Sequence, residues 1–177
     1  MKTMGIGFRK TKLTIVAVML VLFICFVSFS DRTSRTTSAS SVGPAASHTN
    51  APGEANCTAC HLGIPLNSGG GSVSVSGLPA NYKPGQQYTL TLTTERPGGV
   101  IFGFQVTALN SRNLQAGTFS TVTTSPQQTQ IVTGVVGGNQ RRYVEHTGDG
   151  VTPTQFDTKS WTMRWTAPQT QIGRAHV

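Results

Sequence analysis

Apolar and polar residues alternate with a period of two along the chain from Ser72 onward. Val73 and Val75 alternate with serines, and Tyr88, Leu90 and Leu92 alternate with threonines. Successive side chains of a strand point to opposite faces, so this alternation is typical of half-buried strands. It predicts strands at about residues 72–76, 88–93, 102–108, 117–124, 129–136, 141–146 and 160–167.

Short runs rich in Gly and Pro separate these segments, among them Pro84-Gly85, Gly137-Gly138-Asn139 and Gly148-Asp149-Gly150. Such runs supply turns between strands, and no long amphipathic helix competes with them. About seven strands over roughly 100 residues predict an all-β fold, an immunoglobulin-like antiparallel β-sandwich. We assign it to residues 72–171, where a missing final strand would leave an open edge.

The N-terminus has the pattern of an export signal. Four basic residues up to Lys12 precede an apolar run of about 17 residues, and Ser28-Phe29-Ser30 follow as a cleavage site. Residues 1–30 are therefore predicted to be a signal peptide or, alternatively, an N-terminal membrane anchor. We expect an exported protein in the periplasm, at the cell surface or outside the cell.

The formal net charge of +8 does not indicate a nucleic-acid binder once its distribution is considered. Between Asp31 and Gln171 there are nine basic and six acidic residues, and Arg141-Arg142 is the largest basic cluster. A surface that tracks phosphates needs more clustered charge than this. We expect no nucleic-acid partner, and we interpret Arg141-Arg142 as a solvated strand end.

The segment before the first strand is rich in Ser, Thr, Ala, Gly and Pro. Such composition buries too little apolar surface to offset the entropy of ordering, so residues 31–50 are expected to be a disordered linker. Residues 51–71 form a loop that contains Cys57-Thr58-Ala59-Cys60-His61. This C-x-x-C-H run is a c-type haem attachment signature.

In that interpretation Cys57 and Cys60 bind the two vinyl groups of one haem c through thioethers, and His61 is the proximal iron ligand. His48 and His146 are the distal candidates, whereas Met163 shares a strand face with two tryptophans and is interpreted as core. Two alternatives remain open. A Cys57–Cys60 disulfide would leave the chain without a cofactor, and zinc or dithiol redox chemistry ranks last.

No catalytic constellation is recognisable, because the acidic residues are scattered and no nucleophile elbow or phosphate loop is present. The first hypothesis is an exported, surface-attached sandwich that carries one haem for electron transfer to redox partner proteins or extracellular acceptors. The alternative is a non-catalytic adhesion or recognition module with the Cys57–Cys60 disulfide. In neither case do we expect an enzyme.

Several blocks of the sequence occur in an order that resembles a known bacterial family. They are Ala51-Pro52-Gly53-Glu54, Asn56 to His61, Asn67 to Gly71, Leu78-Pro79-Ala80, Tyr82 to Gly85, Phe102 to Gln105, Tyr143 to Thr147 and Trp165 to Pro168. Over residues 43–169 the chain resembles the choice-of-anchor V proteins, which are similar to the Reeler (reelin N-terminal type) domain. The resemblance implies a Reeler-like sandwich held at the cell envelope, through an N-terminal anchor or a C-terminal anchor missing here.

The last six residues, 172–177, interrupt the Thr-rich strand pattern. They match the in-frame translation of a common sequencing adapter, so we expect them to be an artefact and leave them out of the fold.

Overall fold

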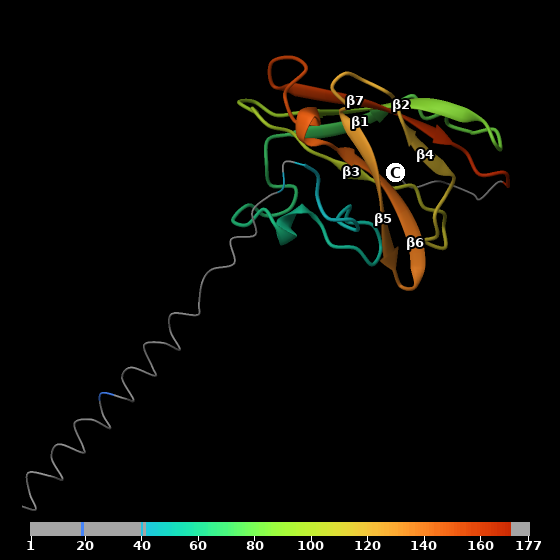
Figure 1. The fold of residues 1–177 in the computed structure, drawn as a ribbon, viewed down its shortest axis with the longest axis horizontal. Coiled ribbons are helices and arrows are strands. Elements are labelled where there is room, and N and C mark those ends of the chain that lie inside the picture. Colours follow the sequence, from blue (N-terminus) through green and yellow to red (C-terminus); the bar gives the residue numbers. More distant parts are fainter. Residues whose placement is uncertain (1–18, 20–39, 41, 171–177) are drawn as a thin grey trace, which may run out of the picture. The chain divides into compact units, whose positions relative to one another are not determined.

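Seven strands form two antiparallel sheets in the computed structural model, which describes residues 19, 40 and 42–170 (Figure 1). The first sheet has the order β1-β2-β7-β4 and the second has the order β3-β6-β5. The strands are β1 (Ser72–Ser76), β2 (Gln87–Glu95), β3 (Gln105–Val106), β4 (Thr118–Thr121), β5 (Thr129–Val136), β6 (Asn139–His146) and β7 (Thr158–Thr166). Two short 3₁₀ helices, η1 (Cys57–Ala59) and η2 (Gly148–Gly150), lie outside the sheets. The all-β antiparallel sandwich predicted from the alternation is confirmed.

The longest pairing joins β2 and β7 in antiparallel register, with Leu90 opposite Met163 and Leu92 opposite Trp161. Along β7 the residues alternate between buried and solvent-facing positions, as a half-buried strand requires. Met163 lies in the core with Trp161 and Trp165, as predicted. The two indole N–H groups donate to the carbonyl oxygens of Gly150 and Ala116.

β1 differs from the expected half-buried strand, because all five of its residues are exposed. It pairs only with β2 and forms one edge of its sheet, while the second sheet ends at β3. β3 itself contains two residues, whereas the sequence predicted a strand over residues 102–108. Val73 and Val75 therefore face an open side of the sandwich.

The outer face of β6 is buried, although its residues there are polar. Val144 faces the hydrophobic core, whereas Arg141, Tyr143 and Glu145 alternate with it on the opposite face, and all four are buried. The cover comes from residues 42–56, which run beside this sheet in Figure 1. The side chains of Gln130 and Gln105 donate to the carbonyl oxygens of Val42 and Ala45.

The expectation of a disordered linker over residues 31–50 therefore does not hold for residues 42–50. Polar side chains of β3 and β5 bind the backbone of this segment, and such bonds offset the entropy that its composition alone could not. Gly43 has a φ of +117°, and a Cβ there would overlap Glu145 Oε1. Only glycine fits this close approach.

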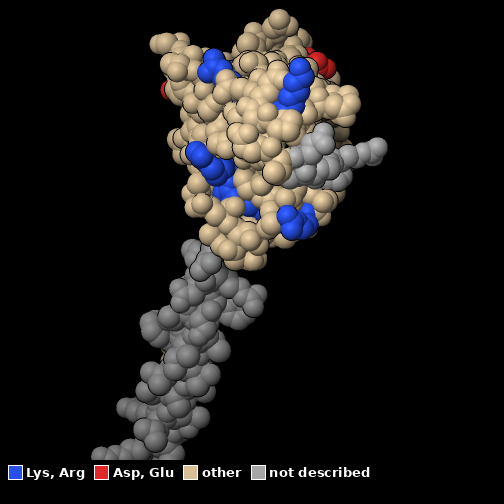
Figure 2. Space-filling model, turned by 90° about the vertical axis from the view of Figure 1, so that its right-hand side faces the viewer, with Lys and Arg blue, Asp and Glu red and all other residues tan. Residues whose placement is uncertain are grey.

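The predicted signal or anchor at 1–30 and the suspected artefact at 172–177 lie essentially outside the described residues. Within the described part of the chain, no helix has the length and hydropathy to cross a membrane. On the face shown in Figure 2, Lys and Arg side chains are scattered among uncharged residues and form no continuous patch.

Candidate functional site

The C-x-x-C-H run forms a single capped helical turn. The Asn56 side-chain oxygen accepts hydrogen bonds from the Thr58 N–H at 2.9 Å and the Thr58 hydroxyl at 2.6 Å, which is the arrangement of a helix N-cap. The His61 N–H donates to the Cys57 carbonyl oxygen at 2.8 Å, so one full turn separates these residues. Side chains three residues apart lie above one another on a 3₁₀ turn, so Cys57 and Cys60 lie on one side and His61 is the next residue.

This side of the turn is accessible to solvent. Cys57 and His61 are exposed, Cys60 is half-buried, and the two sulfurs are not joined as a disulfide. The loop that follows the turn carries three exposed large apolar side chains, at Leu62, Ile64 and Leu66. The turn thus presents two thiols and an imidazole at a surface with apolar neighbours.

Backbone bonds fold the segment before the turn into a compact loop. Asn50 donates to the Ala55 carbonyl oxygen at 2.9 Å, and Ala55 donates back to the Ser47 carbonyl oxygen at 3.1 Å. The Asn56 side-chain amide also donates to the Asn50 side-chain oxygen at 3.3 Å. The position of the turn is consequently tied to that of residues 47–55.

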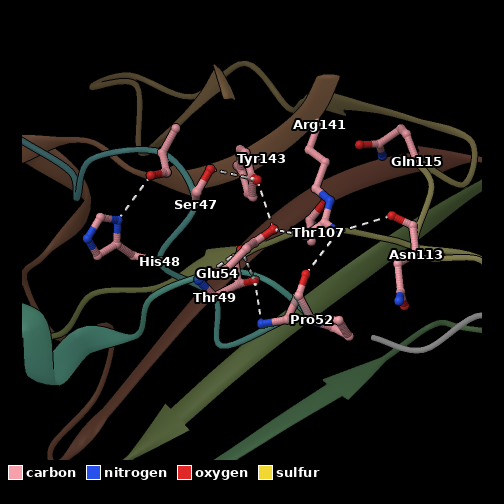
Figure 3. A network of polar contacts seen from close by, with 12 residues as sticks. Ser47, His48, Thr49, Pro52, Glu54, Thr107, Asn113, Gln115, Arg141 and Tyr143 are labelled. Carbon is pink, nitrogen blue, oxygen red and sulfur yellow. Dashed lines mark hydrogen bonds and ion pairs between the residues drawn. The ribbon is translucent and has the colours of Figure 1, made fainter. Parts of the chain in front are cut away.

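A buried ion pair fastens this loop to the sandwich (Figure 3). Glu54 Oε1 accepts from Arg141 at 2.5 Å and from the Tyr143 hydroxyl at 2.8 Å. Its other oxygen accepts from the Thr49 hydroxyl at 2.6 Å and from the Thr49 N–H at 3.2 Å. The side chains of Arg141 and Glu54 are 3% and 0% exposed. A carboxylate with four donors is well compensated for the loss of water.

Arg141 also binds the backbone of this same loop and of one further segment, since its second terminal nitrogen donates to the carbonyl oxygens of Pro52 and Asn113, both at 3.0 Å. The interpretation of Arg141-Arg142 as a solvated strand end is wrong for Arg141 and holds only for Arg142, which is exposed. The physical reason is that residues 42–56 cover the outer face of β6.

The protonation of the pair follows from its surroundings. Burial raises the pKa of Glu54, but the hydrogen bonds from Thr49, Arg141 and Tyr143 outweigh that effect and bring the pKa below its ordinary value of 4.5. Burial, together with the neighbouring Glu54 carboxylate, raises the pKa of Tyr143 above its ordinary 10.0. At neutral pH the tyrosine is therefore a donor and the glutamate an anion.

The two expected distal ligands lie in different surroundings. His146 is buried at the end of β6, where its Nδ1 lies 3.0 Å from the Phe104 nitrogen and 3.2 Å from the Phe104 carbonyl oxygen and its ring lies against Phe104. His48 is half-buried in the segment of residues 42–56 that covers β6. Its Nδ1 lies 2.9 and 3.0 Å from the carbonyl oxygens of Ala45 and Ala46. In the described part of the chain, no three His, Cys, Asp or Glu side chains cluster as a ready metal site.

Comparison with known proteins gives a limited likeness. No model of a protein family matches the chain, and no curated protein matches it. The human F-spondin reeler domain matches at 26% identity and a TM-score of 0.39, over 58% of this chain and 68% of that one. The Reelin-N domain of F-spondin matches at 24% identity and a TM-score of 0.38, over 58% and 66%.

Both of these solved structures are Reeler domains, the class that the sequence resembles. Because the TM-scores are low, the fold assignment rests on the strand pairing described above. The more specific choice-of-anchor V assignment stays a prediction.

The ion pair was missed from the sequence, where Glu54 was one of several scattered acidic residues. A signal was present in Arg141-x-Tyr143-x-Glu145, because polar residues capable of pairing occupied one face of a strand whose other face is core. Its partner Glu54 is 87 residues away along the chain. Periodicity within one strand does not report such a contact.

Replacing Glu54→Gln removes the negative charge and leaves Arg141 buried without a counter-ion. We expect amide hydrogen exchange of residues 47–55 to become about thirtyfold faster. This factor corresponds to a loss of about 2 kcal/mol in the free energy of local opening, the size expected for hydrogen bonds to a charged group. The amides of β2 and β7 should keep their protection. Hydrogen exchange read by mass spectrometry measures both regions. Glu95→Gln, at an exposed strand end, is the matched control, and unchanged exchange in Glu54→Gln would contradict the role given to the pair.

The stability from Glu54 should depend on pH. Because its folded pKa is depressed, this contribution is complete above the unfolded value near 4.5 and is lost as the pH falls through the lower folded pKa. Urea unfolding midpoints measured from about pH 6 to about pH 3 should therefore fall more steeply for the native chain than for Glu54→Gln. If the urea midpoints of the two proteins fell equally steeply with pH, Glu54 would not be the group whose protonation lowers the stability.

Proposed function

We propose that this chain is an exported electron-carrying protein that binds one haem c at Cys57 and Cys60, with His61 as the proximal iron ligand. The observation that carries the proposal is the capped and accessible turn, in which Cys57 and Cys60 lie three residues apart and His61 follows directly. Two sulfurs and an imidazole in this order match the residues that haem attachment requires.

Attachment needs no oxidant or reductant. Cys57 and Cys60 would hold the group by adding their S–H bonds across its two vinyl double bonds, with sulfur on one vinyl carbon and the hydrogen on the other. Bound in this way, haem supplies one-electron transfer between two oxidation states of iron. The chain itself holds the group in place and exposes it to partners.

The surroundings of the two histidines support His48 over His146 as the distal ligand. Two backbone carbonyl oxygens lie at Nδ1 of His48, so the proton belongs on that nitrogen and the lone pair remains on Nε2. The Nδ1 of His146 instead makes its contact within the core, as the acceptor of the Phe104 N–H at 3.0 Å or as a donor to the Phe104 carbonyl oxygen at 3.2 Å. Moving its ring would break that bond and open the packing around Phe104.

The sandwich itself supports a non-catalytic binding role at most. The partners named next follow from the proposed haem and not from the sandwich. Redox partner proteins or extracellular acceptors would approach the exposed turn, with the cell envelope holding the chain through an N-terminal anchor or a further C-terminal one. Export is supported by the basic and apolar N-terminal sequence. In the alternative, a recognition module, a Cys57–Cys60 disulfide replaces the cofactor.

Intact mass separates these two states of the chain. Protein matured with c-type haem machinery and measured without reductant should exceed the polypeptide mass by one haem, about 600 Da. A disulfide would instead lower the mass by two hydrogens. The double variant Cys57→Ala and Cys60→Ala should carry no added mass, whereas Ser68→Ala, in the same loop, should keep it. A native protein that gains no mass would refute the proposal.

A further inference from the structure

β1 is an edge strand whose sequence reads the same in both directions. Its residues are Ser-Val-Ser-Val-Ser, so reversing the strand leaves the order of its side chains unchanged. It pairs with β2 on one side and ends the four-stranded sheet there. No strand of the described chain pairs with its other side, where the backbone N–H and C=O groups are available to a further strand.

β1 lacks the features that usually keep an edge strand from pairing with another molecule. It contains no charged residue and no proline, and all five of its residues are exposed. Val73 is 68% exposed and Val75 is 38% exposed, although both line a groove of about 1120 Å³ together with the core residues Leu92 and Leu109. Two aliphatic side chains therefore face the open side of the sandwich without cover.

The groove beside β1 carries no formal charge. Its described walls come from β1 with Leu78, from the loop at residues 49–52 and from parts of the chain between residues 105 and 113, and no lining residue is acidic, basic or a histidine. Basic residues outnumber acidic ones by nine to six between Asp31 and Gln171, so identical charged faces of this protein would tend to repel each other. The uncharged groove brings no like charges together when it meets its own copy.

We infer that two copies of this chain pair through β1, antiparallel and about a two-fold axis at Ser74. Val73 then lies opposite Val75 of the second copy, Ser72 lies opposite Ser76 of the second copy, and Ser74 lies opposite itself. A two-fold dimer requires a surface that is complementary to itself, and a strand that reads the same in both directions meets this requirement. The inference goes beyond the proposed function and does not depend on haem.

Pairing in this register covers the groove as well as the strand edge. Directly opposite residues of paired strands share a face of the sheet, so Val73 and Val75 of the second copy face the groove from the added strand. Covering apolar surface is favourable by roughly 25 cal/mol per Å². A five-residue strand spans only about 17 Å, so the contact is small and we expect dissociation in the micromolar range, roughly 1–100 µM.

The other edges of the two sheets fit a second copy less well. β5 ends the second sheet with Thr-Gln-Ile-Val-Thr-Gly-Val-Val, which is not symmetric on reversal, and β4 packs near it. β3 has two residues and β4 has four, which is too short to direct a register. A peptide from another protein would need only the unpaired backbone of β1, whereas the symmetry and the absence of charge favour an identical strand.

Single cysteines along β1 test both the pairing and its register. In a chain with Cys25, Cys57 and Cys60 replaced by alanine, Ser74→Cys should form a disulfide-linked dimer under mild oxidation, because opposite Cα atoms lie about 4.5–5.5 Å apart. Ser72→Cys and Ser76→Cys should each fail to cross-link alone, but a mixture of the two should cross-link. Ser120→Cys, at an exposed position on β4, is the matched control and should not cross-link.

Sedimentation equilibrium in the same cysteine-free background measures the association without a cross-link. Val73→Lys places an ammonium group at the pairing edge of each copy and should weaken the dimer by at least about tenfold. The side chain is already exposed, so the fold should be kept, as circular dichroism can verify. Val135→Lys, at a 69% exposed position on β5, should leave the dimer unchanged.

Three results would overturn the inference: a chain that stays monomeric up to about 0.1 mM, cross-linking of Ser72→Cys with itself, or equal weakening by Val73→Lys and Val135→Lys. A dimer that meets all the expectations above supports it. The cysteine-free background carries no attached haem, so none of these outcomes tests the proposed function, which can fail or stand separately.

Discussion

The buried pair between Glu54 and Arg141 is the interaction on which the arrangement of this protein depends. It joins a loop near the N-terminal end of the described chain to the outer face of β6. A buried ion pair of this kind gives limited net stability, but removing one partner is costly because the other is left without compensation. The pair therefore acts chiefly to fix where the loop lies, and Thr49 and Tyr143 donate further hydrogen bonds to its carboxylate.

Fixing the loop has a consequence for the chemistry. Functional groups carried on loops need a rigid scaffold if their geometry is to be reproducible. Here the scaffold is the sandwich, and the connection runs from Arg141 through Glu54 to the residues around Asn56 that cap the turn. The same arginine also binds the carbonyl oxygens of Pro52 and Asn113. One side chain of β6 thus fixes the loop that leads into the C-x-x-C-H turn.

The sandwich was predictable because alternation with a period of two is a local signal. β5 begins and ends at the predicted residues, and β7 buries the tryptophans and methionine that shared its predicted face. The exposure of β1 and the burial of Arg141 were not predictable in this way. Both depend on the neighbours of a strand. β1 is at the edge of its sheet and has no cover, whereas residues 42–56 cover the outer face of β6. Contacts between distant segments leave little trace in the periodicity of either one.

The C-x-x-C-H motif was readable from spacing alone, whereas its cap and its anchorage were not. These features show how an exposed motif is held in a fixed position, which the proposed haem attachment requires. The visible absorption spectrum of protein matured with c-type haem machinery, taken after acid–acetone extraction of unattached haem, tests the central claim most directly. The account predicts that a Soret band remains with the polypeptide. A colourless polypeptide after extraction would contradict it.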